Sequence, residues 1–263
     1  MSLLDQITSS VKSGLDERRK DFEYRRALNT KFASAVLRSC IPFPQKSWDN
    51  TIIAEVKMNS PTKGRLARES ETPEEVAAQY LKGGAQTISV LTEAIYFEGD
   101  LSHLASIRKM AKSTPLMRKD FVVDKMQIQE ARAFGADGVL LIACLLEDAL
   151  KDFLDYAKSV GMWTLVETRR AEEIAYALES DADIIGVNSR DLHSGSVDLD
   201  KQAALCTLIP DNKTYVVESG VSYPEDIRYL RENCPRKPDA YLVGTALMTA
   251  PDRPAKLKSL REA

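Results

Sequence analysis

The chain has 263 residues, of which 44% are hydrophobic and 29% are charged, and a formal net charge of −3. This balance is typical of a globular protein with one large α/β domain or two small ones, and it excludes the basic patch of a nucleic-acid-binding protein. The first residues lack the apolar segment of a signal peptide, and no run of about 18 apolar residues predicts a membrane span. Four scattered cysteines and two histidines predict a reduced, cytoplasmic protein without a metal site.

Eight short apolar runs follow one another from residue 51 onward, with segments of helical spacing between them. Clear helical segments are 72–84, 124–137, 169–181 and 223–234. Strands that alternate with helices form parallel βαβ units, and eight units of roughly 25 residues match the size of a (β/α)8 barrel. The predicted strands are 51–56, 87–92, 115–120, 138–143, 163–167, 183–188, 214–219 and 240–245.

A doubly wound sheet is the alternative architecture. It usually carries a GxGxxG turn after its first strand, and "VKMNSPTKG" (56–64) contains none. The first 48 residues are rich in charged helix formers and predict one or two helices that end near Pro42 and Pro44. We therefore expect a helical extension over 1–48 and a single barrel domain over 49–263.

Polar residues collect where the predicted strands end. In a (β/α)8 barrel these carboxyl ends converge on one rim, where active sites are built. The residues concerned are Glu55, Lys57, Thr92, Glu93, Arg118, Lys119, Asp120, Glu167, Asn188, Arg190, Glu218, Ser219, Gly244 and Thr245.

The first of these groups is unusual for a buried strand. Successive side chains of a strand alternate between its two faces, so Glu55 and Lys57 point the same way, toward the barrel axis. An ion pair with a purely structural role is the alternative interpretation. That interpretation weakens because seven ionic or amide groups at one rim are costly to desolvate unless a ligand or a reaction uses them. The seven are Glu55, Lys57, Lys119, Glu167, Asn188, Arg190 and Glu218.

Two glycine-containing turns follow the last two predicted strands. Ser219 and Gly220 lie in one turn, and Gly244 and Thr245 lie in the other, just before a predicted helix start. Barrels often bind phosphate at this place, because glycine lets backbone N–H groups approach an anion closely. Ordinary strand-to-helix turns are the alternative interpretation.

These segments together resemble the indole-3-glycerol phosphate synthase family of tryptophan biosynthesis. The resemblance rests on "IIAEVKMNSPTKG" (52–64), "PLMRKDF" (115–121), "LVET" (165–168), "IIGVNSRDL" (184–192), "VVESGV" (216–221) and "LVGTALM" (242–248), which occur in the order of the family. It implies a lyase that converts 1-(2-carboxyphenylamino)-1-deoxyribulose 5-phosphate into indole-3-glycerol phosphate, CO₂ and water, without a metal or an organic cofactor.

The resemblance also implies a set of site residues. The active-site set is Glu55, Lys57, Lys119, Glu167, Asn188, Glu218 and Ser219; the substrate contacts are Ser60, Phe97 and Arg190; and the phosphate site is Lys57, Gly220, Gly244 and Thr245. The chain departs from the usual family pattern at Met58, Asn59, Ala94, Ser189 and Thr245. None of these positions has a proton-transfer role in the family, so we expect the departures to change the affinity for the substrate more than the activity.

Ring closure requires an acid near the ketone oxygen of the substrate. Lys119 is the expected acid, and Lys57 is the alternative. Burial and a second lysine lower a lysine pKa, whereas Glu55 and Glu167 raise it, and the sequence leaves that balance open. The two glutamates supply base and electrostatic roles, Asn188 can orient Glu167, and Glu218 is expected to position the substrate together with Ser219.

Two other functions remain as alternatives. Phosphoribosylanthranilate isomerase is a related phosphate-binding barrel, but its family uses a cysteine base at the end of the first strand, where this chain has none. A non-catalytic barrel that binds a phosphorylated metabolite would not need the acid–base residues. The expected partner is a phosphorylated small molecule, with no nucleic acid and no membrane; other tryptophan-pathway enzymes would be separate chains, and the oligomeric state stays open.

Overall fold

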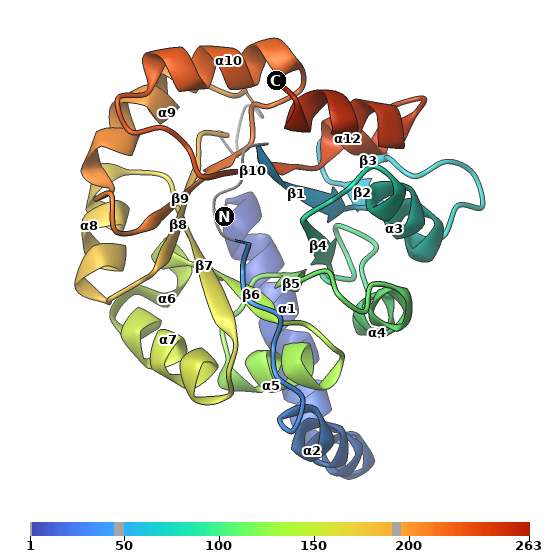
Figure 1. The fold of residues 1–263 in the computed structure, drawn as a ribbon. Coiled ribbons are helices and arrows are strands. Elements are labelled where there is room, and N and C mark those ends of the chain that lie inside the picture. Colours follow the sequence, from blue (N-terminus) through green and yellow to red (C-terminus); the bar gives the residue numbers. More distant parts are fainter. Residues whose placement is uncertain (1, 45–49, 191–195) are drawn as a thin grey trace.

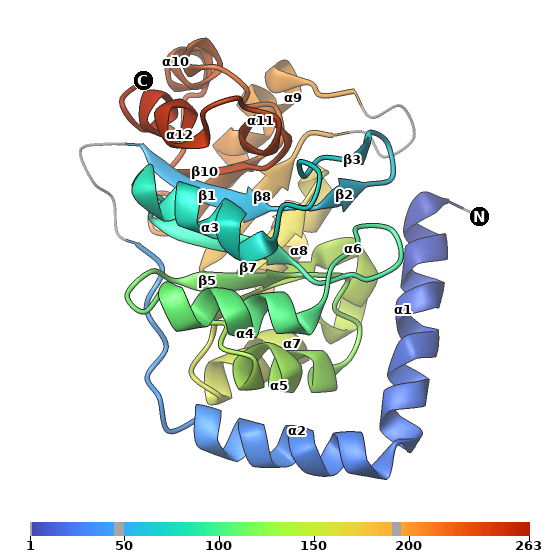
Figure 2. The ribbon, with the colours of Figure 1, turned by 90° about the vertical axis from the view of Figure 1, so that its right-hand side faces the viewer.

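The computed structural model describes residues 2–44, 50–190 and 196–263. Its first two elements are the helices α1 (Leu3–Lys20) and α2 (Phe22–Ala35). Asp21 separates them, since its side chain caps α2 by accepting a hydrogen bond from the backbone N–H of Tyr24. Figure 2 shows α1 standing along one side of the molecule and α2 lying across its base. The expected boundary at residue 48 falls outside the described residues.

Eight parallel strands form a closed barrel, in the order β1-β10-β9-β8-β7-β6-β5-β4 (Figure 1). Each predicted apolar run coincides with one of them to within two residues at either end, which confirms the (β/α)8 expectation. The strands are β1 (Thr51–Val56), β4 (Thr87–Leu91), β5 (Leu116–Lys119), β6 (Gly138–Ile142), β7 (Trp163–Thr168), β8 (Ile184–Asn188), β9 (Thr214–Glu218) and β10 (Ala240–Val243).

Helices surround the barrel, and several start with caps that the sequence encodes. Thr72 and Glu75 form a capping box at the start of α3, and Asp124 caps α5 in the same way. The helices are α3 (Pro73–Lys82), α4 (Leu101–Met110), α5 (Lys125–Ala133), α6 (Ala143–Leu146), α7 (Leu150–Ser159), α8 (Ala171–Glu179), α9 (Leu199–Leu205), α10 (Pro224–Asn233), α11 (Thr245–Met248) and α12 (Arg253–Arg261), with 3-10 turns at Glu147–Ala149 and Cys206–Leu208.

One element has no counterpart among the predicted ones. A small antiparallel hairpin, β2 (Asn59–Ser60) and β3 (Gly64–Arg65), follows the first barrel strand. Each of its strands has only two residues, so no hydrophobic alternation marks it in the sequence. The hairpin brings Ser60 to the mouth of the barrel.

The core has two layers that follow the alternation of side chains along each strand. Ile52, Ala54 and Val56 belong to the layer between the barrel and the helices, whereas Ile53 belongs to the layer inside the barrel. The inner layer also contains Met117, Leu140, Leu165 and Val216. Side chains that continue the inner face toward the carboxyl ends of the strands are polar, and they form the site. None of the helices in the described ranges has the length and apolar character that a membrane span needs.

Candidate active site

A cavity of about 730 Å³ opens at the carboxyl ends of the barrel strands. Every residue that the sequence assigns to the site lines this cavity, although these residues come from distant parts of the chain. They are Glu55, Lys57, Ser60, Phe97, Lys119, Glu167, Asn188, Arg190, Glu218, Ser219, Gly220, Gly244 and Thr245. Among the described residues, no group of three or more His, Cys, Asp or Glu side chains could hold a metal ion.

The ammonium group of Lys119 lies between two carboxyl groups. Its Nζ is 3.2 Å from Oε2 of Glu167 and 3.6 Å from Oε2 of Glu218. Burial acts to lower the pKa of Lys119, but the nearby carboxyl groups, Glu167 first and then Glu218 and Glu55, outweigh burial and raise the pKa above its ordinary value. The balance that the sequence leaves open is therefore decided in favour of a charged ammonium.

Glu167, on β7, accepts hydrogen bonds from three side chains. The donors are Nζ of Lys119 at 3.2 Å, Nη2 of Arg169 at 2.7 Å and Nδ2 of Asn188 at 3.1 Å. Burial acts to raise the pKa of this carboxyl group, but the charges of the lysine and the arginine, together with the hydrogen bonds, hold it well below its usual range. Glu167 is therefore a fixed, charged carboxylate at neutral pH.

Glu218, on β9, has the opposite environment. It is 1% exposed, and neither of its carboxyl oxygens accepts a hydrogen bond from a donor in the described part of the chain. Burial and then the charge of Glu167 raise the pKa of Glu218 above its usual range, against the opposing effect of Lys119. Gly186 lies on β8, between the strands that carry Glu167 and Glu218. It makes room for the carboxyl group of Glu218, because a Cβ at position 186 would collide with Oε1 of Glu218.

Glu55 and Lys57 form the second lysine–carboxylate pair; Glu55 lies on β1, and Lys57 follows directly after this strand. Nζ of Lys57 is 2.6 Å from Oε1 of Glu55, and both side chains line the cavity, as the period-two alternation predicts. Gly244 makes this pair possible, because a Cβ at that position would meet both the carboxyl group of Glu55 and the ammonium of Lys57. The glycine that the sequence assigns to phosphate binding thus also has a steric role.

The turn after β9 has an unusual backbone. Ser219 and Gly220 have φ angles of 71° and 95°, in the left-handed region that favours glycine. A Cβ at Gly220 would lie 2.6 Å from Cδ2 of Leu199. A larger residue at Gly220 would therefore disturb the fold itself, apart from any effect on a bound anion. In the other predicted turn, α11 begins directly at Thr245.

Two aromatic side chains, Phe97 and Phe121, also line the cavity. The rings of Phe97 and Phe121 are tilted toward each other, with centroids 6.1 Å apart. The carboxylate of Glu93 holds the loop that carries Phe97, because it accepts hydrogen bonds from three successive backbone N–H groups, those of residues 95–97. Glu93 is a rim residue in the sequence, and in the structure it supports the rim without lining the cavity.

Some cavity residues were missed by the sequence analysis. Phe121 and Arg169 each stand two positions after a predicted site residue, Lys119 and Glu167, so the alternation that connects Glu55 with Lys57 would have indicated both. Leu3, Leu4 and Ile7 of α1 also line the cavity. No local pattern in the sequence predicts where a separate helix docks on a barrel.

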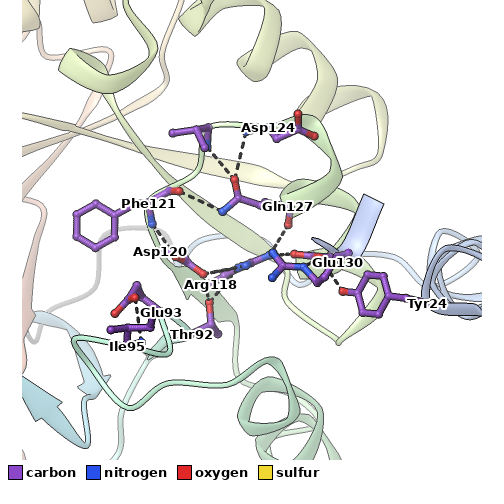
Figure 3. A network of polar contacts seen from close by, with 12 residues as sticks. Tyr24, Thr92, Glu93, Ile95, Arg118, Asp120, Phe121, Asp124, Gln127 and Glu130 are labelled. Atoms are coloured by element: carbon purple, nitrogen blue, oxygen red, sulfur yellow. Dashed lines mark hydrogen bonds and ion pairs between the residues drawn. The ribbon is translucent and has the colours of Figure 1, made fainter. Parts of the chain in front are cut away.

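Arg118 is a different case, because the structure turns it away from the cavity. Its guanidinium donates to Oδ2 of Asp120 at 2.8 Å, to Oε2 of Glu130 at 3.0 Å and to the backbone oxygen of Gln127 at 2.7 Å (Figure 3). Glu130 in turn accepts a hydrogen bond from the hydroxyl group of Tyr24 at 2.7 Å. The sequence analysis placed Arg118 with the rim groups; that placement is wrong, because Arg118 and Lys119 lie on opposite faces of β5.

The closed barrel and the buried lysine–carboxylate cluster at its carboxyl-terminal rim define a (β/α)8-barrel enzyme. Comparison with known proteins gives the family. The family model for indole-3-glycerol phosphate synthase matches residues 4–260, so the chain belongs to the indole-3-glycerol phosphate synthase family, whose members are carboxy-lyases of tryptophan biosynthesis.

Individual relatives agree with this assignment. The indole-3-glycerol phosphate synthase of Kineococcus radiotolerans is 42% identical over 268 residues, which cover 96% of this chain and 92% of the relative. That of Aliarcobacter butzleri is 41% identical over 258 residues and covers 95% of this chain and 94% of the relative. Among solved structures, 3-hexulose-6-phosphate synthase from Salmonella typhimurium superposes with a TM-score of 0.65 at 15% identity, over 80% of this chain and 96% of that one, which shows a shared fold alone.

Proposed function

We propose that this chain converts 1-(2-carboxyphenylamino)-1-deoxyribulose 5-phosphate into indole-3-glycerol phosphate, CO₂ and water in the rim cavity. A ring carbon attacks the ketone carbon, the ketone oxygen takes a proton, the carboxylate leaves as CO₂, and the new hydroxyl group leaves as water. The observation that carries the proposal is the ammonium group of Lys119, which lines the cavity between the carboxyl groups of Glu167 and Glu218.

Lys119 is proposed as the acid that protonates the ketone oxygen. Its position between Glu167 and Glu218 fixes the direction of its remaining N–H bonds, and a fixed donor stabilises a developing oxyanion without reorganisation. Its raised pKa keeps it protonated at neutral pH, as an acid requires. Lys57 is closely paired with Glu55 at 2.6 Å, so we assign it an electrostatic role toward the carboxylate or the phosphate of the substrate.

The dehydration step needs a base and a proton donor. Glu167 is proposed as the base, with Asn188 as the residue that orients it through the hydrogen bond of 3.1 Å. Its depressed pKa supplies the charged form, and Glu55 adds negative charge next to the positive charge that develops on the substrate. Glu218 and Ser219 are proposed to position the substrate.

Two groups of cavity residues suit the two ends of this substrate. Phe97 and Phe121, whose rings contact each other, are proposed to pack against the anthranilate ring, because aromatic rings favour tilted or offset contacts. The turns at Gly220 and Thr245, with Gly244 and Lys57, are proposed to hold the phosphate. Ser60 and Arg190 line the cavity and are proposed as further substrate contacts.

We further propose that residues 1–48 are a helical extension of the catalytic barrel at 49–263, and that the apolar side chains of α1 shield the reacting groups from water. The enzyme would act in the cytoplasm without a cofactor, and the other enzymes of the pathway would be separate chains. The oligomeric state is open to measurement.

The direct test mixes the purified protein with the substrate and follows the rise of indole fluorescence. Replacing Lys119 by Ala is expected to lower kcat by at least about a hundredfold, the scale of lost acid catalysis, with a smaller change in KM. Lys151, an exposed lysine on α7, provides the matched control, and K151A is expected to react at the rate of the unchanged protein. No fluorescence change with the unchanged protein would exclude the proposed reaction, and normal turnover by K119A would remove Lys119 from the mechanism.

A further inference from the structure

Arg169 lies in the wall of the cavity, directly after β7, and neither the family resemblance nor the proposed mechanism gives it a role. Its Nη2 donates to Oε1 of Glu167 at 2.7 Å, and its side chain is 17% exposed. Its backbone N–H donates to Oε2 of Glu173 on α8 at 2.7 Å, which ties the arginine to the helix that follows. Arg169 is thus held in place by two hydrogen bonds, one from its guanidinium group and one from its backbone N–H.

The two buried carboxyl groups near Arg169 are unequal. Glu167 accepts from Lys119, Arg169 and Asn188, whereas Glu218 receives no hydrogen bond from a donor in the described ranges. Glu218 is 1% exposed, so its ionised form would be a buried charge without a hydrogen-bond donor, and the charge of Glu167 opposes its ionisation further. This environment favours a proton on one of the two carboxyl groups.

The contacts decide which carboxyl group holds that proton. Lys119 touches both groups, at 3.2 and 3.6 Å, so its charge favours ionisation of both. Arg169 is the cation that contacts Glu167 and not Glu218. An arginine stays charged at every pH at which a protein is folded, so the preference does not vanish as other groups titrate.

We propose that Arg169 is a positioning residue of the reaction: its guanidinium keeps Glu167 as the charged carboxylate and so leaves the proton on Glu218. A protonated Glu218 can donate a hydrogen bond to a substrate oxygen, which a carboxylate cannot do. This inference rests on the proposed function, since it assigns the forms in which two residues of that site act.

Other charged or titratable groups also face the pair, from every side of the rim. R169M leaves all of these groups in place. They are Glu55 and Lys57 from the first strand, Lys119 from β5, Cys144 from α6, Glu173 from α8 and Arg190 after β8.

The test compares R169M, R169K and the control R170M with the unchanged protein. Arg170 is the neighbouring residue, but it is 66% exposed and pairs with Glu173 outside the cavity. R169M is expected to lower kcat by about ten- to a hundredfold with KM changed less than about threefold. The reason is that the base loses its charged form, whereas the substrate keeps its contacts. R169K should recover much of the loss, and R170M should equal the unchanged protein.

The pH profile of kcat separates this role from a structural one. Without Arg169 the pKa of Glu167 rises toward that of an ordinary or buried carboxyl group. The acidic limb of the profile is therefore expected to move to higher pH by about one unit or more in R169M, and the loss should be larger at low pH than at high pH. A uniform loss at every pH, or an unchanged profile, would overturn the proposal.

A second readout does not depend on turnover. Difference infrared spectroscopy at neutral pH is expected to show the band of one protonated buried carboxyl group, which E218Q removes and E167Q does not. In the R169M background, E167Q should remove or shift that band instead. The same assignment of the band with and without Arg169 would refute the inference even if the enzyme acted on another substrate. Absence of turnover in the unchanged protein, with the expected bands, would refute only the proposed function.

Discussion

Arg118 and Lys119 are neighbours on β5, yet they belong to two polar clusters with opposite properties. Arg118 faces the helices, where its three nitrogen atoms donate to Thr92, Asp120, Gln127 and Glu130 at 2.7 to 3.2 Å. Lys119 faces the barrel axis, where its Nζ donates one hydrogen bond to Glu167 and lies 3.6 Å from Oε2 of Glu218. Both clusters are largely buried, and in each of them one cation lies between two carboxyl groups.

The difference lies in how completely the buried groups are satisfied. In the outer cluster each carboxyl group accepts several hydrogen bonds, as buried polar groups in folded proteins generally do. In the inner cluster Glu218 accepts none from a donor among the described residues. A saturated cluster holds structure, because any change leaves a buried charge without a partner. An unsaturated one keeps hydrogen-bonding capacity for a ligand.

The largest effect is expected from breaking the outer cluster. R118M removes the cation that compensates Asp120 and Glu130, so two buried carboxylates lose their main partner. Unpaired buried charges of this kind cost about 3–5 kcal/mol of the free energy of unfolding, and denaturant unfolding measures this loss. K109M, at an exposed position of α4, is the matched control and is expected to unfold like the unchanged protein. Unchanged stability of R118M would show that the cluster does not hold the fold.

The comparison also shows what the sequence could reveal. The barrel was predictable because each strand is an apolar run between helices of clear amphipathic spacing. The inner cluster was predictable because Glu55, Lys119, Glu167 and Glu218 are charged residues where such runs end, and those ends meet in a barrel. The resemblance to a family added the remaining site residues, such as Phe97.

The outer cluster was not predictable in the same way. Arg118 and Lys119 are both basic, and only the register of β5 against its neighbours decides which of them faces the axis. The contact of Glu130 with Arg18 and Tyr24 joins residues more than a hundred positions apart in the chain. A packing contact between two separate elements cannot be predicted from the sequence pattern of either element alone.

A smaller effect, on activity alone, is expected at Glu55. E55Q keeps the shape of the side chain and removes its charge, and the buried carboxyl group of Glu218 then experiences less repulsion. We expect kcat to fall by about ten- to a hundredfold while the free energy of unfolding changes by less than about 1 kcal/mol, since charges at functional sites seldom stabilise a fold. Steady-state kinetics and denaturant unfolding provide the two values.

Glu225 supplies the control for this change. It is an exposed glutamate whose partner Arg228 lies one helical turn away, so E225Q should leave both values unchanged. If E55Q instead lost stability while its folded fraction kept full turnover, Glu55 and Lys57 would be a structural ion pair that happens to line the cavity.

The smallest effect is expected where the outer cluster meets the N-terminal helices. Y24F deletes the hydroxyl group that donates to Oε1 of Glu130, but Arg18 still donates to the same oxygen at 2.9 Å, so the carboxylate is not left without a partner. A single hydrogen bond of this kind contributes about 1 kcal/mol, and in a chain of this size that lowers Tm by about 2–4 °C. The kcat of Y24F should stay within about twofold of that of the unchanged protein. Arg118 still donates to Asp120, and Asp120 still accepts a hydrogen bond from the loop that follows Lys119. Calorimetry of Y24F and of Y229F, which loses only an exposed hydrogen bond to Asp200, measures the difference. Equal Tm values for the two variants would show that α2 is not anchored through Tyr24, and a large fall in kcat would show that the outer cluster transmits its geometry to the reacting lysine.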